Sequence, residues 1–257
     1  MTVQPSKICR YLDWDSQFFH HRIARLEPSS ITRADVASAL AWCLAERIDC
    51  LYYLAPADEF NSIHLAEGAG FHLVDIRMTF SLPARHSPAL PADPQIRLAG
   101  PADIPALREI ARQAYQSTRF FNDPHFSRKA CEKLYMTWIE NSCQGYAQAV
   151  WVADVENTPV GFITCHLDKD HGQIVLVGIH PDHHHRGWGR KLVNAALNWL
   201  SSQLCNSVQV VTQGNNLPAQ KLYAACGFSI LSVACWYHRW FDQSLEGGLN
   251  DRISDTL

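Results

Sequence analysis

One stretch decides the fold: Ile174-Val-Leu-Val-Gly-Ile-His-Pro-Asp-His-His-His-Arg-Gly-Trp-Gly-Arg-Lys-Leu192. It opens with an apolar, β-branched run over 174–179, which has the length and composition of a buried strand. A turn with Gly187 and Gly189 follows, and apolar residues then recur at helical spacing as far as Leu200. A strand, a glycine-rich turn and a helix direct backbone N–H groups and a helix N-terminus toward an anion. The stretch therefore predicts an anion-binding turn within an α/β fold.

The composition of the chain is that of an ordinary globular protein. It has 257 residues, of which 47% are hydrophobic, and a formal net charge of −3. This balance gives no reason to expect binding to nucleic acid or to a membrane surface. We find no signal peptide and no run near the roughly 20 apolar residues of a membrane span. Nine scattered cysteines without a Cys-x-x-Cys pair indicate reduced thiols, so we expect a cytoplasmic protein.

A proline-rich segment, 83–94, divides the chain. It contains four prolines and no apolar periodicity, as a stiffened linker does. We therefore predict a first unit over 1–82, a second over 95–241 and a polar tail over 242–257. Apolar periodicity in the first unit predicts helices over 35–47 and 61–69, a strand over 50–54 and either one strand or a strand pair over 71–82. In the second unit it predicts strands over 95–98, 149–155, 160–167, 172–179, 208–212, 228–231 and 234–241, and helices from Pro101 and over 127–141, 191–200 and 218–225.

The glycine turn resembles a known motif of the GNAT superfamily of N-acetyltransferases. The family pattern is Gln/Arg-x-x-Gly-x-Gly/Ala, and this chain has His184-His-Arg-Gly-Trp-Gly189. In the family, backbone amides of this loop hold the pyrophosphate of acetyl-CoA. His184 departs from the pattern, but because the amides bind the ligand we expect the histidine to be tolerated, with pH-dependent affinity for CoA.

A second segment strengthens the resemblance. Asn216-Leu-Pro-Ala-Gln-Lys-Leu-Tyr-Ala-Ala-Cys-Gly-Phe228 matches the family's Asn-x-x-Ala-x-x-x-Tyr-x-x-x-Gly-Phe. The family's Asn contacts the pantetheine arm, and its Tyr hydroxyl lies near the thioester sulfur. The resemblance thus implies Tyr223 as the catalytic acid that protonates the leaving thiolate. Its implied cofactor-binding residues are Val177, Ile179, His184, His185, Arg186, Gly187, Trp188, Gly189, Arg190 and Asn216.

The same resemblance implies the fold. We expect an α/β (α+β) GNAT fold, with a mixed central sheet flanked by helices and a truncated GNAT-like N-terminal domain. Strand 174–179 should splay from the strand at 208–212, so that pantetheine pairs with free backbone groups at Val177 and Ile179. A short similarity between the segments 66–73 and 223–230 is consistent with a partial duplication.

Two aromatic segments narrow the expected substrate. The segments 13–19 and 117–126 resemble those of acetyltransferases that act on nucleotide-linked (dTDP-type) 4-amino-dideoxysugars. This implies a small-molecule sugar-nucleotide acceptor, contacted by Arg119 and Phe120, and direct attack by its 4-amino group on acetyl-CoA. The chain is then expected to work as a soluble enzyme and as a homodimer.

Other interpretations stay open. The chain could acetylate a peptide N-terminus or a small amine metabolite, or it could be a non-enzymatic acyl-CoA-binding module. The general base is not identified, and His166 and Asp168 are candidates by position only. Four histidines at 180, 183, 184 and 185 lack carboxylate or cysteine partners at metal-ligand spacing, so we expect no metal site.

Overall fold

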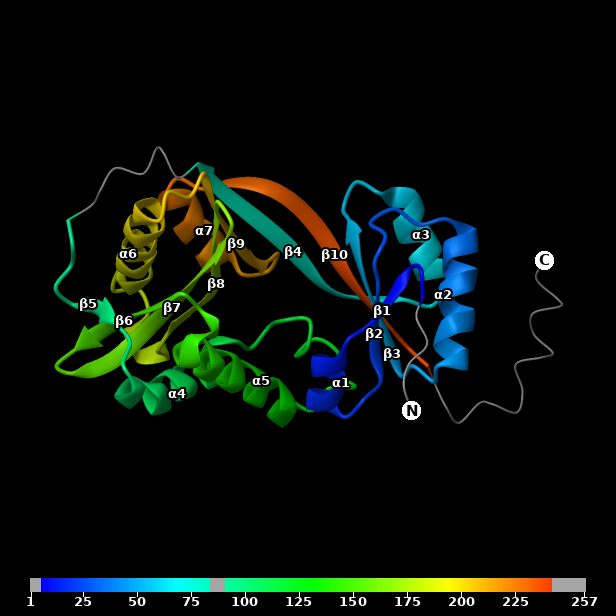
Figure 1. Cartoon of the computed structure of the whole chain (residues 1–257), viewed down its shortest axis with the longest axis horizontal. Coiled ribbons are helices and arrows are strands. Elements are labelled where there is room, and N and C mark those ends of the chain that lie inside the picture. The colour runs from blue at the N-terminus through cyan, green and yellow to red at the C-terminus, as the bar shows by residue number, and fades with distance from the viewer. Residues whose placement is uncertain (1–5, 84–90, 242–257) are drawn as a thin grey trace. The chain divides into compact units, whose positions relative to one another are not determined.

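The structure, a computed structural model, describes residues 6–83 and 91–241, which belong to two compact units (Figure 1). Among the described residues, the first unit is formed by 6–74 together with 234–241. The second runs from Asp75 to Val233. The sequence placed a single boundary within 83–94. Part of that segment, 84–90, and the predicted tail, 242–257, lie outside the described residues.

The first unit is a small sheet with three helices. Its strands follow the order β1-β2-β3-β10, with β2 and β3 parallel and the other pairs antiparallel. Thr32 begins α2 with a capping box, in which its hydroxyl accepts the N–H of Asp35 and the Asp35 carboxylate accepts the N–H of Thr32. The elements are β1 (Cys9–Tyr11), α1 (Asp13–Phe19), β2 (Ile23–Leu26), α2 (Arg33–Ala45), β3 (Cys50–Pro56), α3 (Phe60–Gly68), the start of β4 (His72–Pro83) and the end of β10 (Ser229–Trp240).

The second unit is a mixed sheet with helices on both faces. Its strand order is β10-β4-β9-β8-β7-β6-β5, and β8 and β9 form its parallel pair. Helix α6 connects these two strands, as a crossover between parallel strands requires. The further elements are β5 (Ile96–Leu98), α4 (Ile104–Ala114), α5 (Arg128–Asn141), β6 (Ala149–Val155), β7 (Thr158–Asp168), β8 (His171–Ile179), α6 (Trp188–Ser202), β9 (Ser207–Gln213) and α7 (Leu217–Ala225), with short helical turns at Pro101–Asp103, Ser142–Tyr146 and Pro181–His183.

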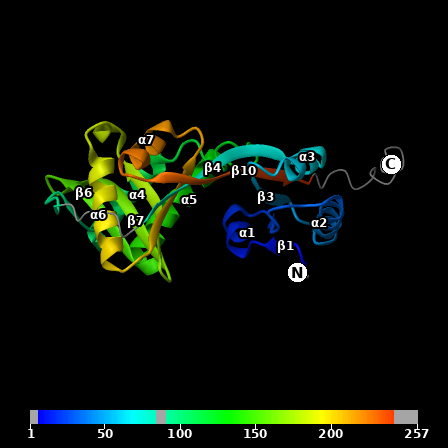
Figure 2. The same cartoon turned by 90° about the horizontal axis from the view of Figure 1, so that it is seen from above.

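Helices α6 and α7 cover one face of this sheet, and α4 and α5 cover the other (Figures 1 and 2). The apolar face predicted for α6 is buried in the main core, where Leu192, Val193 and Leu200 are fully covered. Helix α4 contributes Leu107 and Ile110 to the opposite face.

Strands β8 and β9 separate partway along their length. Their pairing runs from His171 to Ile174 of β8 and then ends. At the same level β8 carries a bulge, in which Val175 and Leu176 face the single residue Thr164 of β7, and the Thr164 hydroxyl accepts the N–H of Leu176. A bulge increases the local twist of a sheet, so it turns the end of β8 away from β9. The predicted splay of the central strand is therefore present.

Most predicted elements are found within two or three residues of their expected bounds, and the predicted fold class, a mixed sheet flanked by helices, is confirmed. The prediction of two strands at 228–231 and 234–241 was wrong, because β10 is continuous from Ser229 to Trp240. Its residues from Ala234 to Trp240 pair with β3, and β10 also neighbours β4 in the strand order. The aromatic segment 13–19 forms a helix, α1, which was not among the predicted elements.

Candidate active site

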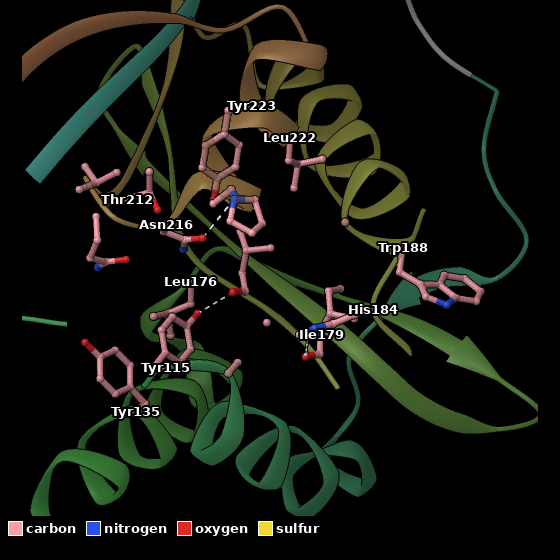
Figure 3. Close-up of a pocket in the computed structure, with 18 of the residues that line it drawn as sticks. Tyr115, Tyr135, Leu176, Ile179, His184, Trp188, Thr212, Asn216, Leu222 and Tyr223 are labelled. Carbon is pink, nitrogen blue, oxygen red and sulfur yellow. Dashed lines mark hydrogen bonds between the residues drawn. The ribbon is translucent and has the colours of Figure 1, made fainter. Parts of the chain in front are cut away.

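The splay between β8 and β9 opens into a cavity of about 460 Å³ (Figure 3). Its walls come from the end of β8, the turn 183–189, the end of β9, the start of α7 and aromatic residues of α4 and α5. Nearly all the residues that the two motifs identified converge here. Those that line it are Val177, Ile179, His184, His185, Gly187, Trp188, Gly189, Asn216 and Tyr223.

The edge of β8 presents backbone groups to this cavity. The N–H of His180 donates to Val160 of β7 at 2.8 Å, so by strand alternation Val177 and Ile179 turn their backbone groups the other way. The carbonyl of Val177 accepts the Tyr115 hydroxyl at 2.9 Å. Each carbonyl oxygen has two lone pairs and each residue has an N–H, so this edge retains capacity to pair with an amide-bearing ligand.

The turn after β8 gathers backbone donors at the start of α6. Across the described residues, no hydrogen bond uses the five consecutive N–H groups of residues 185–189. The chain reverses here because His185 and Gly187 have positive φ angles of 61° and 81°. His184 Nε2 lies 3.0 Å from the carbonyl oxygen of Ile179 and ties the turn back to the strand. The result is a row of free amides at a helix N-terminus, which suits a pyrophosphate.

Glycine is required at positions 187 and 189 of the turn for different physical reasons. A Cβ on Gly187 would meet nothing within 4 Å, so its left-handed φ is what favours glycine there. A Cβ on Gly189 would lie 3.0 Å from Leu222 Cδ2 of α7. Gly189 therefore allows α6 and α7 to approach each other, which brings the two motifs together.

The side chains of three other predicted residues of the turn, Trp188, Arg186 and Arg190, do not point into the cavity. The Trp188 ring is buried and points away from the cavity, against the Lys191 ammonium, so it offers the cavity its backbone alone (Figure 3). The side chains of Arg186 and Arg190 are exposed and are not among the residues that line the cavity. Their position beside the turn leaves them available to a phosphate by electrostatic attraction at longer range.

Asn216 is the N-cap of α7, and Tyr223 lies about two turns further along the helix. The Oδ1 of Asn216 caps the helix by accepting the N–H of Ala219 at 3.2 Å, which directs its amide nitrogen to the cavity side. Tyr223 packs its ring between Phe80 and Phe228, with centroids 5.9 and 6.0 Å away, and its hydroxyl points into the cavity (Figure 3). Burial raises the pKa of the Tyr223 phenol, so it holds its proton at neutral pH. It is therefore placed as a proton donor.

The structure adds Tyr115 and Tyr135, which the sequence had not indicated as site residues. Their rings stack with centroids 4.2 Å apart and planes 10° from parallel, and both line the cavity opposite α7. Burial raises the pKa of both phenols. A tyrosine directly after α4 gives no sequence signal that its hydroxyl meets a strand 62 residues later.

Arg119 and Phe120, predicted to contact the acceptor, are not among the cavity-lining residues. Phe120 is buried, and the Arg119 guanidinium lies 4.2 Å from the centre of its ring. The ring also makes edge contacts with Phe126 and Trp138, of which Trp138 lines the cavity. The segment 117–126 thus supports the cavity wall from behind.

His166 and Asp168 lie away from the cavity. The His166 ring packs against Tyr146 at 5.3 Å, and burial lowers its pKa. Asp168 is exposed at the end of β7.

Among the described residues there is no group of three or more His, Cys, Asp or Glu side chains that could hold a metal ion. All nine cysteines carry free thiols. No helix of residues 6–83 and 91–241 has the length and apolar character needed to cross a membrane.

These features fit a pantetheine-linked nucleotide donor. The free amides of 185–189 would hold its pyrophosphate, the edge of β8 and Asn216 would hold the pantetheine amides, and Tyr223 would face the sulfur. An acyl group on that sulfur would then lie between Tyr223 and the tyrosine pair of α4 and α5 (Figure 3).

Comparison with known proteins also indicates an enzyme that uses an acyl-CoA donor. Residues 104–228 match the Acetyltransferase (GNAT) family. The chain is 27% identical over 232 residues to dTDP-fucosamine acetyltransferase of Escherichia coli O6:H1, covering 89% of this chain and 96% of that protein. It is 23% identical over 196 residues to a spore coat polysaccharide biosynthesis protein of Bacillus subtilis, covering 76% and 68%.

Solved structures agree in fold. A GCN5-related N-acetyltransferase from Sphaerobacter thermophilus superposes with a TM-score of 0.64 at 15% identity, covering 90% of this chain and 76% of that chain. A conserved protein of unknown function from Staphylococcus epidermidis gives 0.66 at 12% identity, with 94% of both chains covered. Residues 104–228 are therefore a GNAT acetyltransferase domain, and the chain is an acetyl-CoA-dependent N-acetyltransferase.

Proposed function

We propose that the chain transfers the acetyl group of acetyl-CoA to the 4-amino group of a nucleotide-linked (dTDP-type) 4-amino-dideoxysugar. The observation that carries this is the likeness to dTDP-fucosamine acetyltransferase along 96% of that protein's length. The likeness to a spore coat polysaccharide biosynthesis protein also favours carbohydrate chemistry. We further propose a cytoplasmic location, a homodimer and a role for residues 1–82 as a truncated GNAT-like domain.

The cavity supports this proposal by its length and its lining. Beyond Tyr223 it continues to Thr212, Gln213 and the tyrosine pair of α4 and α5. This end has hydroxyl and amide groups beside aromatic faces. Such a mixture suits a deoxysugar, which has apolar faces and a few hydrogen-bonding groups.

The proposed reaction is direct attack in a ternary complex. The amine nitrogen attacks the thioester carbonyl carbon, and the carbon–sulfur bond then breaks. Tyr223 donates a proton to the departing thiolate, and the proton lost from the attacked nitrogen restores the phenol. Holding donor and acceptor together in the right geometry supplies most of the rate.

An acceptor screen tests the proposal. Purified protein is mixed with acetyl-CoA and one of a panel of dTDP- and UDP-linked 4-amino sugars, 2-amino sugars, short peptides and small amines, and CoA release is followed. We expect the highest kcat/KM with a dTDP-4-amino-dideoxysugar. A preference for peptides or small amines would contradict the proposal, and CoA binding without turnover of any amine would favour a binding module.

A further inference from the structure

A histidine side chain stands at the start of the row of amides that would hold the pyrophosphate. His184 lines the cavity, and Figure 3 shows its ring beside Ile179, on the opposite side of the cavity from Thr212. The residue is exposed, so a ligand in the cavity has access to the ring. The next residue, His185, supplies the first of the five free N–H groups. A phosphate bound to that row would therefore lie beside the His184 imidazole.

One hydrogen bond fixes where this ring carries its hydrogen. The Nε2 atom of His184 lies 3.0 Å from the carbonyl oxygen of Ile179. A carbonyl oxygen can only accept, so Nε2 carries the hydrogen and the neutral ring has its lone pair on Nδ1. Among the described residues no hydrogen bond uses Nδ1. This atom is the ring nitrogen nearer the main chain, so it is the one that lies beside the amides.

The state of Nδ1 decides how the ring meets a phosphate. In the neutral ring its lone pair repels phosphate oxygens. After the ring takes up a proton, Nδ1–H donates to a phosphate oxygen while Nε2 keeps its bond to Ile179, so the ring does not have to move. Charge-assisted hydrogen bonds of this kind are about twice as strong as neutral ones. Imidazoles exchange this proton between about pH 5 and 8.

The other three histidines of the turn are less suited to this task. His180 does not line the cavity, and its Nδ1 accepts the N–H of Asp182 at 3.3 Å. His183 lines the cavity, but its Nδ1 is buried without a partner among the described residues, so a proton there would be a buried, unpaired N–H. No hydrogen bond in the described part of the chain holds the His185 ring, so a phosphate would first have to fix its rotamer.

The other charged groups of the turn, and of the elements that meet it, are ion-paired or permanently charged. Glu109 pairs with Arg112 on α4, Asp93 pairs with Lys191 on α6, Asp182 lies near His180, and the exposed cations are Arg186, Arg190 and Lys221. Arginine and lysine stay charged between about pH 5 and 8. They attract a polyanion equally over that range, so a pH-dependent part of phosphate binding has to come from an imidazole.

We propose that the imidazolium of His184 is a ligand of the donor's pyrophosphate, so that the enzyme binds acetyl-CoA and CoA more tightly as the pH falls. Binding then takes up a proton, because the complex favours the charged ring. The affinity is highest where the free ring is already protonated and falls as the pH rises through the range in which imidazoles lose their proton. Acetyl-CoA and CoA carry the same pyrophosphate, so both are affected alike.

Calorimetry with dephospho-CoA tests this directly. The 3′-phosphate of CoA itself titrates near about pH 6, whereas dephospho-CoA lacks that group and isolates the pyrophosphate. We expect the wild-type enzyme to bind it roughly 3- to 10-fold more tightly at about pH 5.5 than at about pH 8.5, a modest range because the ring is exposed. Titrations at about pH 7 in buffers of different ionisation enthalpy should show an uptake of about 0.3–0.5 proton. Binding without proton uptake would overturn the proposal.

Three variants separate a ligand from a residue that only fastens the turn. His184→Gln can still donate to the Ile179 carbonyl but cannot gain charge, so its affinity should not change with pH and no proton should be taken up. His184→Arg carries a permanent charge and should bind as tightly at about pH 8.5 as the wild type does at about pH 5.5. His180→Asn keeps an acceptor for the N–H of Asp182 outside the cavity and should retain the wild-type pH dependence.

Two results with these variants would contradict the proposal. If His184→Gln weakened binding equally at every pH and still took up a proton, His184 would only fasten the turn to the strand. If His185→Gln abolished the pH dependence while His184→Gln kept it, the neighbouring ring would be the ligand.

The inference concerns the donor and needs no acceptor, so the outcome of the acceptor screen does not bear on it. It rests on the turn 183–189 as the pyrophosphate site, which Gly189→Glu tests separately. Normal CoA binding by that variant would count against the site as a whole. Loss of binding in Gly189→Glu together with a flat pH profile in the wild type would count against His184 alone.

Discussion

The two ends of the cavity are built in different ways. The donor end is made largely of backbone: free amides of 185–189, the exposed edge of β8 and a helix N-terminus. The acceptor end is made of side chains, among which Tyr115 and Tyr135 stack with ring centroids 4.2 Å apart. Backbone sites need glycines and fixed spacings, whereas side-chain sites depend on which distant residues the fold brings together. The donor end can therefore be predicted from one short sequence motif, whereas the acceptor end cannot.

The largest expected effect is at the donor end. Gly189→Glu places a Cβ 3.0 Å from Leu222 and a negative charge beside the amides that would hold the pyrophosphate. We expect the affinity for CoA, measured by calorimetry, to fall by at least roughly 10²-fold, because charge repulsion and the separation of α6 from α7 act together. Gly68→Glu serves as the control. Gly68 lies in the first unit, and a Cβ there would meet no atom within 4 Å. Unchanged CoA affinity in Gly189→Glu would show that the turn is not the donor site.

The next effect is at the junction of the two ends. Tyr223→Phe keeps the ring between Phe80 and Phe228 but removes the proton donor. We expect kcat to fall by roughly 10²-fold while the affinity for CoA changes little. If kcat were unchanged, another group would have to protonate the thiolate, and the assignment of Tyr223 would be wrong.

The smallest effect concerns the hydrogen bond that links the two ends. Tyr115→Phe removes the donor that binds the Val177 carbonyl at 2.9 Å but keeps the stack on Tyr135. A lost hydrogen bond of this kind costs about 1 kcal/mol, which lowers Tm by about 2–4 °C in a unit of this size. Scanning calorimetry measures this directly. An unchanged Tm together with an unchanged KM for acetyl-CoA would mean that the bond does not hold the strand edge.

The comparison also explains how much the sequence could predict. Local patterns predict the strand, turn and helix around Gly187 and the helix with Asn216 and Tyr223, and the family resemblance implies the splay of β8. All of these are present in the structure. Tyr115 could not be found this way, because its place in the site depends on a hydrogen bond to Val177, which lies 62 residues away in sequence.

The continuous strand β10 was missed for a related reason. Its middle residues are exposed and mixed in character, so no alternating pattern marks Ser232 and Val233 as strand. Pairing with β3 decides the conformation of the residues that follow, from Ala234 onward. Arg119 and Phe120 pack on each other and are not among the residues that line the cavity, so their contact with the acceptor stays a prediction.

The central claim is that one cavity holds donor and acceptor at the same time, the donor on backbone and the acceptor on side chains. Initial rates measured while acetyl-CoA and the amine are both varied test it most directly. Direct attack in a ternary complex predicts double-reciprocal lines that intersect. Parallel lines, which indicate an acetylated enzyme formed before the amine binds, would contradict the account.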